Sequence, residues 1–402
     1  MDPQIEAAVR AVLARPVMGV MVLAGAGSKA LQWVLSIGGA SAFLLEALIP
    51  YASASMADFL GYQPTQSVCA ETAQALARCA YARARALSEA RTPVVGVACT
   101  ATIATNRPKR GDHRCHVATF GGAGLALHSL TLRKGARDRA GEEEVVSRLV
   151  LRALIEAAGG QASVTIPLLA GETVLRGDDP VRAAAERLLS GHARWVTVGA
   201  RGEVAVDAPL QGAILPGSFN PLHEGHLALA DVASRWLGMP VTFELSAINV
   251  DKPPLASEEI VRRAAQFAWR APIVLTRAAR YDEKAALFPG CVFVIGYDTA
   301  VRLFSPRYYG GSTEAMVQKI EGVEAAGCRF LVAGRAGADG AFKTLADIPV
   351  PARFQGLLEG IPESVFRIDI SSTALRTGYM AQREGRSSAS MAHRQTKTGP
   401  MP

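Results

Sequence analysis

Two histidines three residues apart are the side chains in this sequence best suited to chemistry on phosphate groups. His223 and His226 lie in the segment 213–227, where an apolar run ends, a Gly/Ser/Asn/Pro turn follows, and a helix is expected to begin near Glu224. Residues at this spacing share one face of the first helical turn, which also presents free N–H groups and the positive end of the helix dipole. Two imidazoles there can donate hydrogen bonds to phosphate oxygens and to charge that develops during attack on phosphorus. We therefore predict that His223 and His226 are catalytic.

The turn before this helix supplies the first set of expected nucleotide-binding residues, because glycine allows backbone and nucleotide to approach closely. This set is Gly217, Ser218, Phe219, Asn220 and Gly225. A second set follows an expected strand at 365–368 and combines three hydroxyl groups with an arginine whose planar fork can hold phosphate. Its members are Ser371, Ser372, Thr373 and Arg376. Alone, the first set could be a turn with two solvated histidines and the second an ordinary helix cap; together they indicate one phosphate site.

The elements that must position these residues alternate between strand and helix from residue 212 onward. Apolar β-branched runs predict strands, and helical periodicity appears between them. The strands are expected at 213–215, 241–245, 273–275, 292–295 and 330–332, and two of the helices at 227–237 and 258–269. Such alternation is typical of a Rossmann-like α/β domain with a parallel, doubly wound sheet.

The N-terminal half has a different order of elements. Strands are expected at 17–24 and 93–99, a hairpin at 116–120 and 125–133, and helices at 68–90 and 142–158. Residues 161–210 read as a connector with a helix ending at Leu189 and a small hairpin around Arg201-Gly202. The sequence therefore predicts two α/β domains, at 1–160 and 211–380, and a disordered tail at 381–402.

Composition limits the class of protein and its partners. A length of 402 residues suggests two or three domains, and 49% apolar with 20% charged residues excludes a disordered or fibrous chain. The net charge of +7, from 43 basic and 36 acidic residues, is a mild bias towards anionic ligands and predicts no nucleic-acid partner. Six cysteines without a Cys-x-x-Cys pair, no basic N-terminal segment and no long apolar run favour a cytoplasmic protein with no membrane partner.

The two phosphate motifs carry a resemblance to a known superfamily. His223-Glu224-Gly225-His226 fills the Thr/His-x-Gly-His signature of the nucleotidylyltransferases, and residues 370–376 match their second signature, Ile-Ser-Ser-Thr-x-x-Arg. The resemblance covers residues 211–380. It implies attack by a small phosphorylated acceptor on the α-phosphate of a nucleoside triphosphate, with release of pyrophosphate. It also implies Mg²⁺ held mainly by the triphosphate rather than by metal-binding residues.

The same resemblance implies two further residues near the nucleotide. Lys252, in the polar segment 249–254, falls where these enzymes often place a basic residue against the phosphates. Asp298 follows a buried apolar run and resembles the Gly-x-Asp element that the family has near the nucleotide. The alternative for Lys252 is an exposed loop lysine, and the alternative for Asp298 is a helix N-cap.

The complete second signature and the long spacing between the motifs resemble nicotinate and nicotinamide mononucleotide adenylyltransferases. That resemblance implies transfer of AMP from ATP to such a mononucleotide, a step of NAD biosynthesis. Two alternatives stay open: a transferase that uses another phosphorylated acceptor or CTP, and a non-catalytic, nucleotide-binding regulatory protein.

Residues 20–135 resemble the CinA C-terminal family, whose active members deamidate nicotinamide mononucleotide. The segment 36–43 resembles its Gly-x-Ser-x-x-Phe motif, and Tyr51–Met56 falls where the family has Tyr-Ser-Asn-x-x-Lys. The family's Ser-Cys-Thr-Gly-Gly segment, which carries its nucleophile, is replaced by the stretch 24–29, and its lysine by Met56. We therefore expect a catalytically degenerate domain, and the resemblance implies a possible homo-oligomer.

Other candidates in this half have simpler explanations. Ser28 with Lys29 could be a relocated nucleophile pair, but adjacent residues point apart on a helix. His113, Cys115 and His116 could bind a metal, but strand neighbours point to opposite faces, which favours a structural role. The basic loop 107–114 could bind a phosphate or could simply be solvated.

Overall fold

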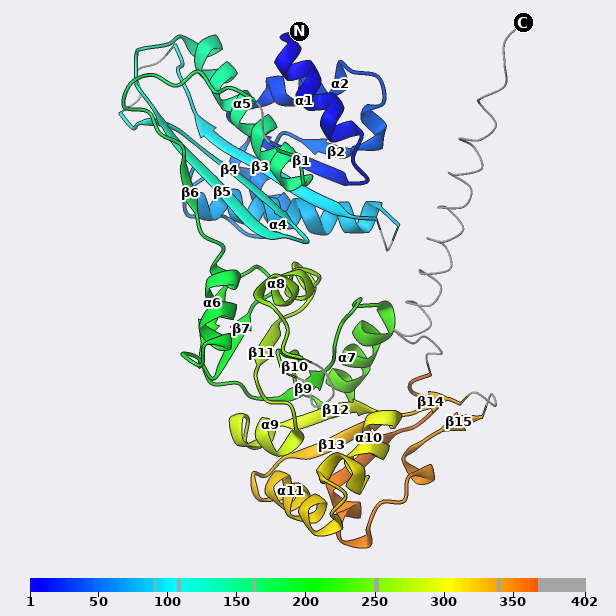
Figure 1. The fold of residues 1–402 in the computed structure, drawn as a ribbon. Helices are drawn as coiled ribbons and strands as arrows, with labels where there is room; N and C mark the ends of the chain where they lie inside the picture. The colour runs from blue at the N-terminus through cyan, green and yellow to red at the C-terminus, as the bar shows by residue number, and fades with distance from the viewer. Residues whose placement is uncertain (90–91, 107–109, 162–163, 249–252, 338–340, 368–402) are drawn as a thin grey trace, which may run out of the picture. The chain divides into compact units, whose positions relative to one another are not determined.

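The computed structural model describes residues 1–367 except 90–91, 107–109, 162–163, 249–252 and 338–340. Contacts between residues divide the chain into two compact units (Figure 1). The first unit is Met1–Ala208 with Pro253–Arg277, and the second is Pro209–Lys252 with Ala278–Pro402. This grouping reflects contacts alone, and the domain limits expected from the sequence stay a prediction.

The first unit is built on a six-stranded sheet with the order β2-β1-β3-β4-β5-β6. The central strand β1 runs parallel to β2 and β3, and β3, β4, β5 and β6 pair antiparallel in succession. The chain passes from β1 to β2 on one side and then to β3 on the other, so its direction of travel reverses at β1. The strands are β1 (Met18–Ala24), β2 (Leu44–Leu48), β3 (Val94–Thr102), β4 (His113–Gly121), β5 (Gly124–Leu132) and β6 (Leu175–Gly177).

Helices cover both faces of this sheet because its strands are apolar on both sides. Met21 and Leu23 of β1 pack in one core with α1, α2 and α5, whereas Val20 and Val22 pack in the other core with α3 and α4. Figure 1 shows α1, α2 and α5 on one side of the sheet and α4 on the other. The helices are α1 (Pro3–Leu13), α2 (Ser28–Leu35), α3 (Ser53–Leu60), α4 (Ala70–Leu87) and α5 (Arg139–Ala157), with a 3₁₀ turn at Ala40–Ala42.

The remainder of the first unit is a small group of elements from two separate segments. The hairpin of β7 and β8 pairs through β7 with the antiparallel strand β11, and α6 packs against α8. Asp179 caps α6 by accepting a hydrogen bond from the Val181 amide at 3.0 Å. The elements are α6 (Pro180–Leu189), β7 (Trp195–Val198), β8 (Val204–Val206), α8 (Ser257–Ala265) and β11 (Ile273–Thr276).

The second unit contains strands in the order β16-β13-β12-β9-β10, and neighbouring strands in this order run parallel to each other. After β9 the chain forms β10 on one side and later β12 on the other, which makes β9 the point where the strand order reverses. The strands are β9 (Ala213–Pro216), β10 (Val241–Ser246), β12 (Val292–Gly296), β13 (Arg329–Ala333) and β16 (Leu358–Ile361), with a small hairpin of β14 (Arg335–Ala336) and β15 (Phe342–Lys343).

Helices follow these strands as the alternating pattern predicted. They are α7 (Glu224–Leu237), α9 (Tyr281–Leu287), α10 (Tyr297–Leu303) and α11 (Thr313–Ala325), with 3₁₀ turns at Pro306–Tyr309, Leu345–Asp347 and Ala352–Leu357. The predicted α/β class and parallel sheet are thus confirmed. The strand expected at 365–368 is wrong over 365–367, because the Pro362 carbonyl accepts from the amides of Val365 and Phe366 and closes a turn. In the part of the chain that the structure describes, no helix is long and apolar enough to cross a membrane.

Candidate nucleotide site

The predicted catalytic histidines lie beyond the carboxyl end of β9, where the strand order of the second unit reverses. Open α/β sheets bind ligands beyond the carboxyl ends of their strands, at the point where strand order reverses. The turn from β9 to α7 carries His223 and His226 to that position, and Asp298 lies at the carboxyl end of the neighbouring strand β12. The topology therefore gathers residues that the sequence separates widely.

Gly217 is the first residue of the turn between β9 and α7, and it has two structural roles. Its amide donates to the Glu244 carbonyl at 2.9 Å, which extends the pairing of β9 with β10. A Cβ atom at this position would lie 2.6 Å from the ring of Phe219, so only glycine leaves space for that ring. Phe219 itself has a backbone φ of 43° and a fully buried side chain. The turn is therefore packed from inside by one aromatic ring.

The two histidine rings stack on each other at the start of α7. Their centroids are 3.7 Å apart with an angle of 25° between the planes, and Phe219 meets His226 edge-on at 5.2 Å. The backbone amide of His223 donates to Nδ1 of His226 at 3.3 Å. Because Nδ1 accepts, the proton of a neutral His226 ring is on Nε2, which makes Nε2–H the donor that a ligand can meet.

Both histidines are held in the neutral form. Burial lowers the pKa of His226 to about 3, and repulsion from His223 acts in the same direction. Burial also lowers the pKa of His223, partly opposed by the neighbouring Glu224 carboxylate. At neutral pH the pair therefore offers hydrogen bonds rather than fixed positive charge.

Asp298 lies in the first turn of α10, after the N-cap residue Gly296, so it is not the cap that the alternative reading assumed. Its carboxylate forms an ion pair with Arg335, which begins β14 directly beyond β13. Both side chains are about half exposed. Arg335 is not among the site residues predicted from the sequence. Its one indication there is that a basic residue follows shortly after a buried strand.

The other predicted binding residues divide into two groups. Gly225 is buried in the first turn of α7, Asn220 is half-buried, and Ser218 is exposed. Five predicted residues lie outside the described part of the chain: Lys252, Ser371, Ser372, Thr373 and Arg376. The described residues contain no group of three or more His, Cys, Asp or Glu side chains arranged to hold a metal ion.

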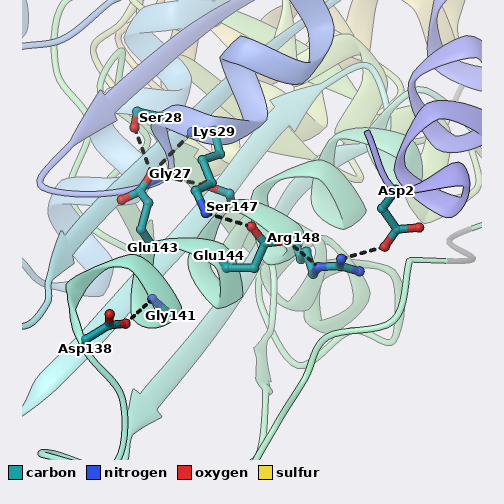
Figure 2. A network of polar contacts seen from close by, with 10 residues as sticks. All are labelled: Asp2, Gly27, Ser28, Lys29, Asp138, Gly141, Glu143, Glu144, Ser147 and Arg148. Carbon is teal, nitrogen blue, oxygen red and sulfur yellow. Dashed lines mark hydrogen bonds and ion pairs between the residues drawn. The ribbon is translucent and has the colours of Figure 1, made fainter.

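The first unit contains a second turn of similar design, between β1 and α2. Gly25 and Gly27 have φ values of 92° and 95°, and a Cβ on Gly25 would lie 1.9 Å from the Ala101 carbonyl oxygen. Here one carboxylate oxygen, Oε1 of Glu143, lies against the helix N-terminus (Figure 2). It accepts from Gly27 N at 3.1 Å, Ser28 Oγ at 2.8 Å, Lys29 N at 3.3 Å and Ser147 Oγ at 3.2 Å.

Lys29 is directed to a different carboxylate from Ser28. Its Nζ lies 2.9 Å from Oε2 of Glu144, and Glu144 also pairs with Arg148 at 2.8 Å. Figure 2 shows both carboxylates on α5, each with its own partners. Ser28 and Lys29 thus do not form a nucleophile–base pair, and the Ser28 hydroxyl donates to an acceptor that three other groups share.

Met56 stands where the CinA family has its lysine, and the surroundings of this side chain are apolar as well. Met56 is 4% exposed and packs in the core with α3 and α4. It also lines a cavity of about 140 Å³ at the carboxyl ends of β1 and β3, together with Ala24, Gly25, Tyr51, Ser53 and Ala101. Among the described residues, no side chain of Asp, Glu, Lys, Arg or His lines this cavity.

The histidines and cysteine of β4 have separate local partners. Nδ1 of His113 lies 2.8 Å from the buried Glu142 carboxylate, and Nδ1 of His116 lies 2.9 Å from Ser129 Oγ. Cys115 is buried in the core with α5, where burial raises the pKa of its thiol to about 12. In the basic loop, Arg114 donates to the Val68 carbonyl at 3.1 Å, and residues 107–109 lie outside the described part.

Fold and site together define a nucleotidylyltransferase-like domain in the second half of the chain. Residues 214–378 match the family model described as Cytidylyltransferase-like, so this part of the chain is similar to the nucleotidylyltransferase superfamily. The family match supports transfer of a nucleotidyl group. It does not distinguish among donors or acceptors.

Solved structures similar to this chain carry CinA-type names. The competence/damage inducible protein CihA from Agrobacterium tumefaciens is 23% identical, with a TM-score of 0.33, over 39% of this chain and 97% of that one. A competence or damage-inducible protein from Enterobacter asburiae is 13% identical, with a TM-score of 0.30, over 39% and 94%. No curated protein matches the sequence.

Proposed function

We propose that the nucleotidylyltransferase-like domain transfers AMP from ATP to nicotinate or nicotinamide mononucleotide and releases pyrophosphate. The observation that carries the transfer step is the stacked, neutral pair His223–His226 at the start of α7. The finer choice of ATP and of this acceptor rests on the resemblance of the two sequence motifs. A homo-oligomer, which the CinA resemblance implies, is part of the same proposal.

In the proposed reaction an oxygen of the acceptor phosphate attacks the α-phosphorus, and the bond from that phosphorus to the bridging oxygen of pyrophosphate breaks. Negative charge increases on the non-bridging and leaving oxygens as the new bond forms. The Nε2–H of His226 and the amides at the start of α7 donate hydrogen bonds to this charge. Because the rings are already oriented by stacking and by the His223 amide, little reorganisation is needed at the moment of reaction.

The positive charge that the neutral histidines lack must come from other groups. Arg376 and Lys252 are proposed to meet the phosphates, and Mg²⁺ is proposed to arrive bound to the triphosphate. Bound Mg²⁺ supplies Lewis-acid neutralisation of the phosphate oxygens. Ser371, Ser372 and Thr373 are proposed to hold the same phosphate chain through their hydroxyl groups.

The test is pyrophosphate release by the full chain with ATP or CTP and a panel of phosphorylated acceptors. Release that requires ATP and a nicotinate or nicotinamide mononucleotide is the expected result. Turnover only with CTP, or only with another acceptor, supports the first alternative. Nucleotide binding by calorimetry without release in any combination supports a regulatory protein and contradicts the proposal.

A further inference from the structure

Two oppositely charged side chains are paired in the interior of the second unit, and one of them lies on β10, the strand next to the predicted catalytic turn 217–226. Nζ of Lys284 in α9 lies 2.6 Å from Oε1 of Glu244 in β10, with 5% and 1% of the side chains exposed. The same Nζ donates to the Ala278 carbonyl at 2.8 Å. The ammonium therefore joins the end of β10 to the chain segment that leads into α9.

Stability alone does not account for such a pair. Removing two charges from water offsets most of their mutual attraction, and apolar side chains of similar volume often give an equally stable protein. Loss of only one partner is costly, because the other charge stays buried without compensation. The position of the pair, beside the turn 217–226, indicates a role other than stability.

Glu244 and its neighbour hold the catalytic turn from one side. The Glu244 carbonyl accepts from the Gly217 amide at 2.9 Å. The ring of Phe243 meets Phe219 edge-on at 5.5 Å, and Phe219 meets His226 at 5.2 Å. A displacement of β10 at Glu244 would therefore move Gly217 through their hydrogen bond. A displacement at Phe243 would move the His226 ring through Phe219.

We propose that Lys284 and Glu244 form a positioning pair that fixes the end of β10 and, through it, the turn from Gly217 to His226. The pair acts through the turn and touches no reacting atom. Its importance for turnover rests on the proposed function, whereas its effect on the position of His226 does not. Catalytic groups must be held within about 0.5 Å of their productive geometry, and an error of about 1 Å can cost about 10² in rate.

The experiment compares a single with a double substitution. Lys284→Met takes the ammonium away from the buried Glu244 carboxylate, so both the melting temperature and kcat should fall. Glu244→Leu with Lys284→Met removes both charges and should regain most of the lost melting temperature. Its kcat should stay about tenfold or more below wild type, with the KM for the nucleotide changed by less than about threefold. The matched control replaces the Arg137–Glu172 pair of the first unit, 2.7 Å apart and 12% and 3% exposed, by Met and Leu and should leave kcat unchanged.

A second measurement is independent of activity. The imidazole C–H signals of His226, assigned by their loss in His226→Gln, should shift in the folded double variant and not in the control. A double variant with wild-type kcat and unshifted His226 signals overturns the proposal. If the wild-type protein turns over none of the substrates, the proposed function fails and the His226 signals alone decide. If the double variant does not fold, Glu244→Gln with Lys284→Met takes its place with the same expected results.

Discussion

Two turns in this chain share one plan and differ in what lies against the helix that follows. Each follows a central parallel strand at the point where strand order reverses, one between β1 and α2 and the other between β9 and α7. At α2 the amides of Gly27 and Lys29 donate to the Glu143 carboxylate. At α7 the first turn instead carries the stacked rings of His223 and His226.

The difference shows that backbone architecture creates a set of donors but does not decide how they are used. An amide that donates to an internal carboxylate cannot donate fully to a ligand at the same time. In the first unit the charge that a helix N-terminus attracts is supplied by the protein itself. In the second unit the helix N-terminus instead carries two imidazoles, which can donate hydrogen bonds to phosphate oxygens as negative charge develops on them.

The largest effect expected from this comparison is on catalysis at α7. His226→Ala should lower kcat by about 10²–10³ and leave nucleotide affinity within a few fold, because its donor acts mainly on charge that develops in the transition state. Steady-state kinetics and separate ATP titrations measure the two quantities. His192→Ala, at an exposed histidine of the first unit, is the control and should have no effect. Near wild-type kcat in His226→Ala would show that the histidine is not catalytic.

A charged residue should behave differently from the neutral histidines. Arg376→Ala should weaken triphosphate binding as well as rate, each by about 10–10², because its charge meets the phosphates in the ground state too. Arg376→Lys should recover only part of the loss, since the bidentate fork is absent. The same kinetic and binding measurements apply. An Arg376→Ala variant with unchanged ATP affinity would place the arginine away from the phosphates.

The buried histidine also makes stability depend on pH. The pKa of His226 is about 3 in the folded protein against an ordinary value of 6.5, so the unfolded chain binds a proton that the folded chain refuses between these values. Its contribution to stability is complete above about pH 6.5 and is lost as pH falls, by up to about 1.4 kcal/mol per unit. Between pH 7 and 5 the wild type should therefore lose about 2 kcal/mol more than His226→Gln in urea unfolding. Equal losses in both proteins would contradict the low pKa.

The corresponding change at α2 should affect stability and leave catalysis untouched. Glu143→Ala removes the acceptor of two amides and two hydroxyl groups and should cost about 1–3 kcal/mol of unfolding free energy. Glu6→Ala breaks an exposed pair with Arg10 and should cost less than about 1 kcal/mol. Denaturant unfolding measures both variants. A loss of nucleotidyl transfer in stable Glu143→Ala would mean that the two turns are not independent.

The smallest expected effect is none at all. The first unit should release no ammonia from nicotinamide mononucleotide, because Met56 replaces the lysine and Ser28 donates to a shared carboxylate. A coupled ammonia assay on the full chain provides the measurement. Ammonia release that disappears in Ser28→Ala would show that the turn at α2 is catalytic after all.

Local signals allowed much of this fold to be predicted, including the turn and helix that carry His223 and His226. The strand 213–215, the following glycine-rich turn and the helix lie within one short segment, so their pattern shows in the sequence and the structure places α7 at Glu224. The role of Glu143 could not be predicted, because its bond to Ser28 joins residues 115 positions apart. The pairs Glu244–Lys284 and Asp298–Arg335 span 40 and 37 positions, and no local pattern announces such partners.

Residues 253–277 belong by their contacts to the first unit, although residues on both sides of them belong to the second. The chain therefore passes between the units three times, at residues 208–209, 252–253 and 277–278. No single stop codon or alternative start can release either unit intact, since every contiguous fragment of one lacks a piece or carries a piece of the other. An expression experiment on one complete unit therefore needs a rearranged gene that joins the two separate segments of that unit.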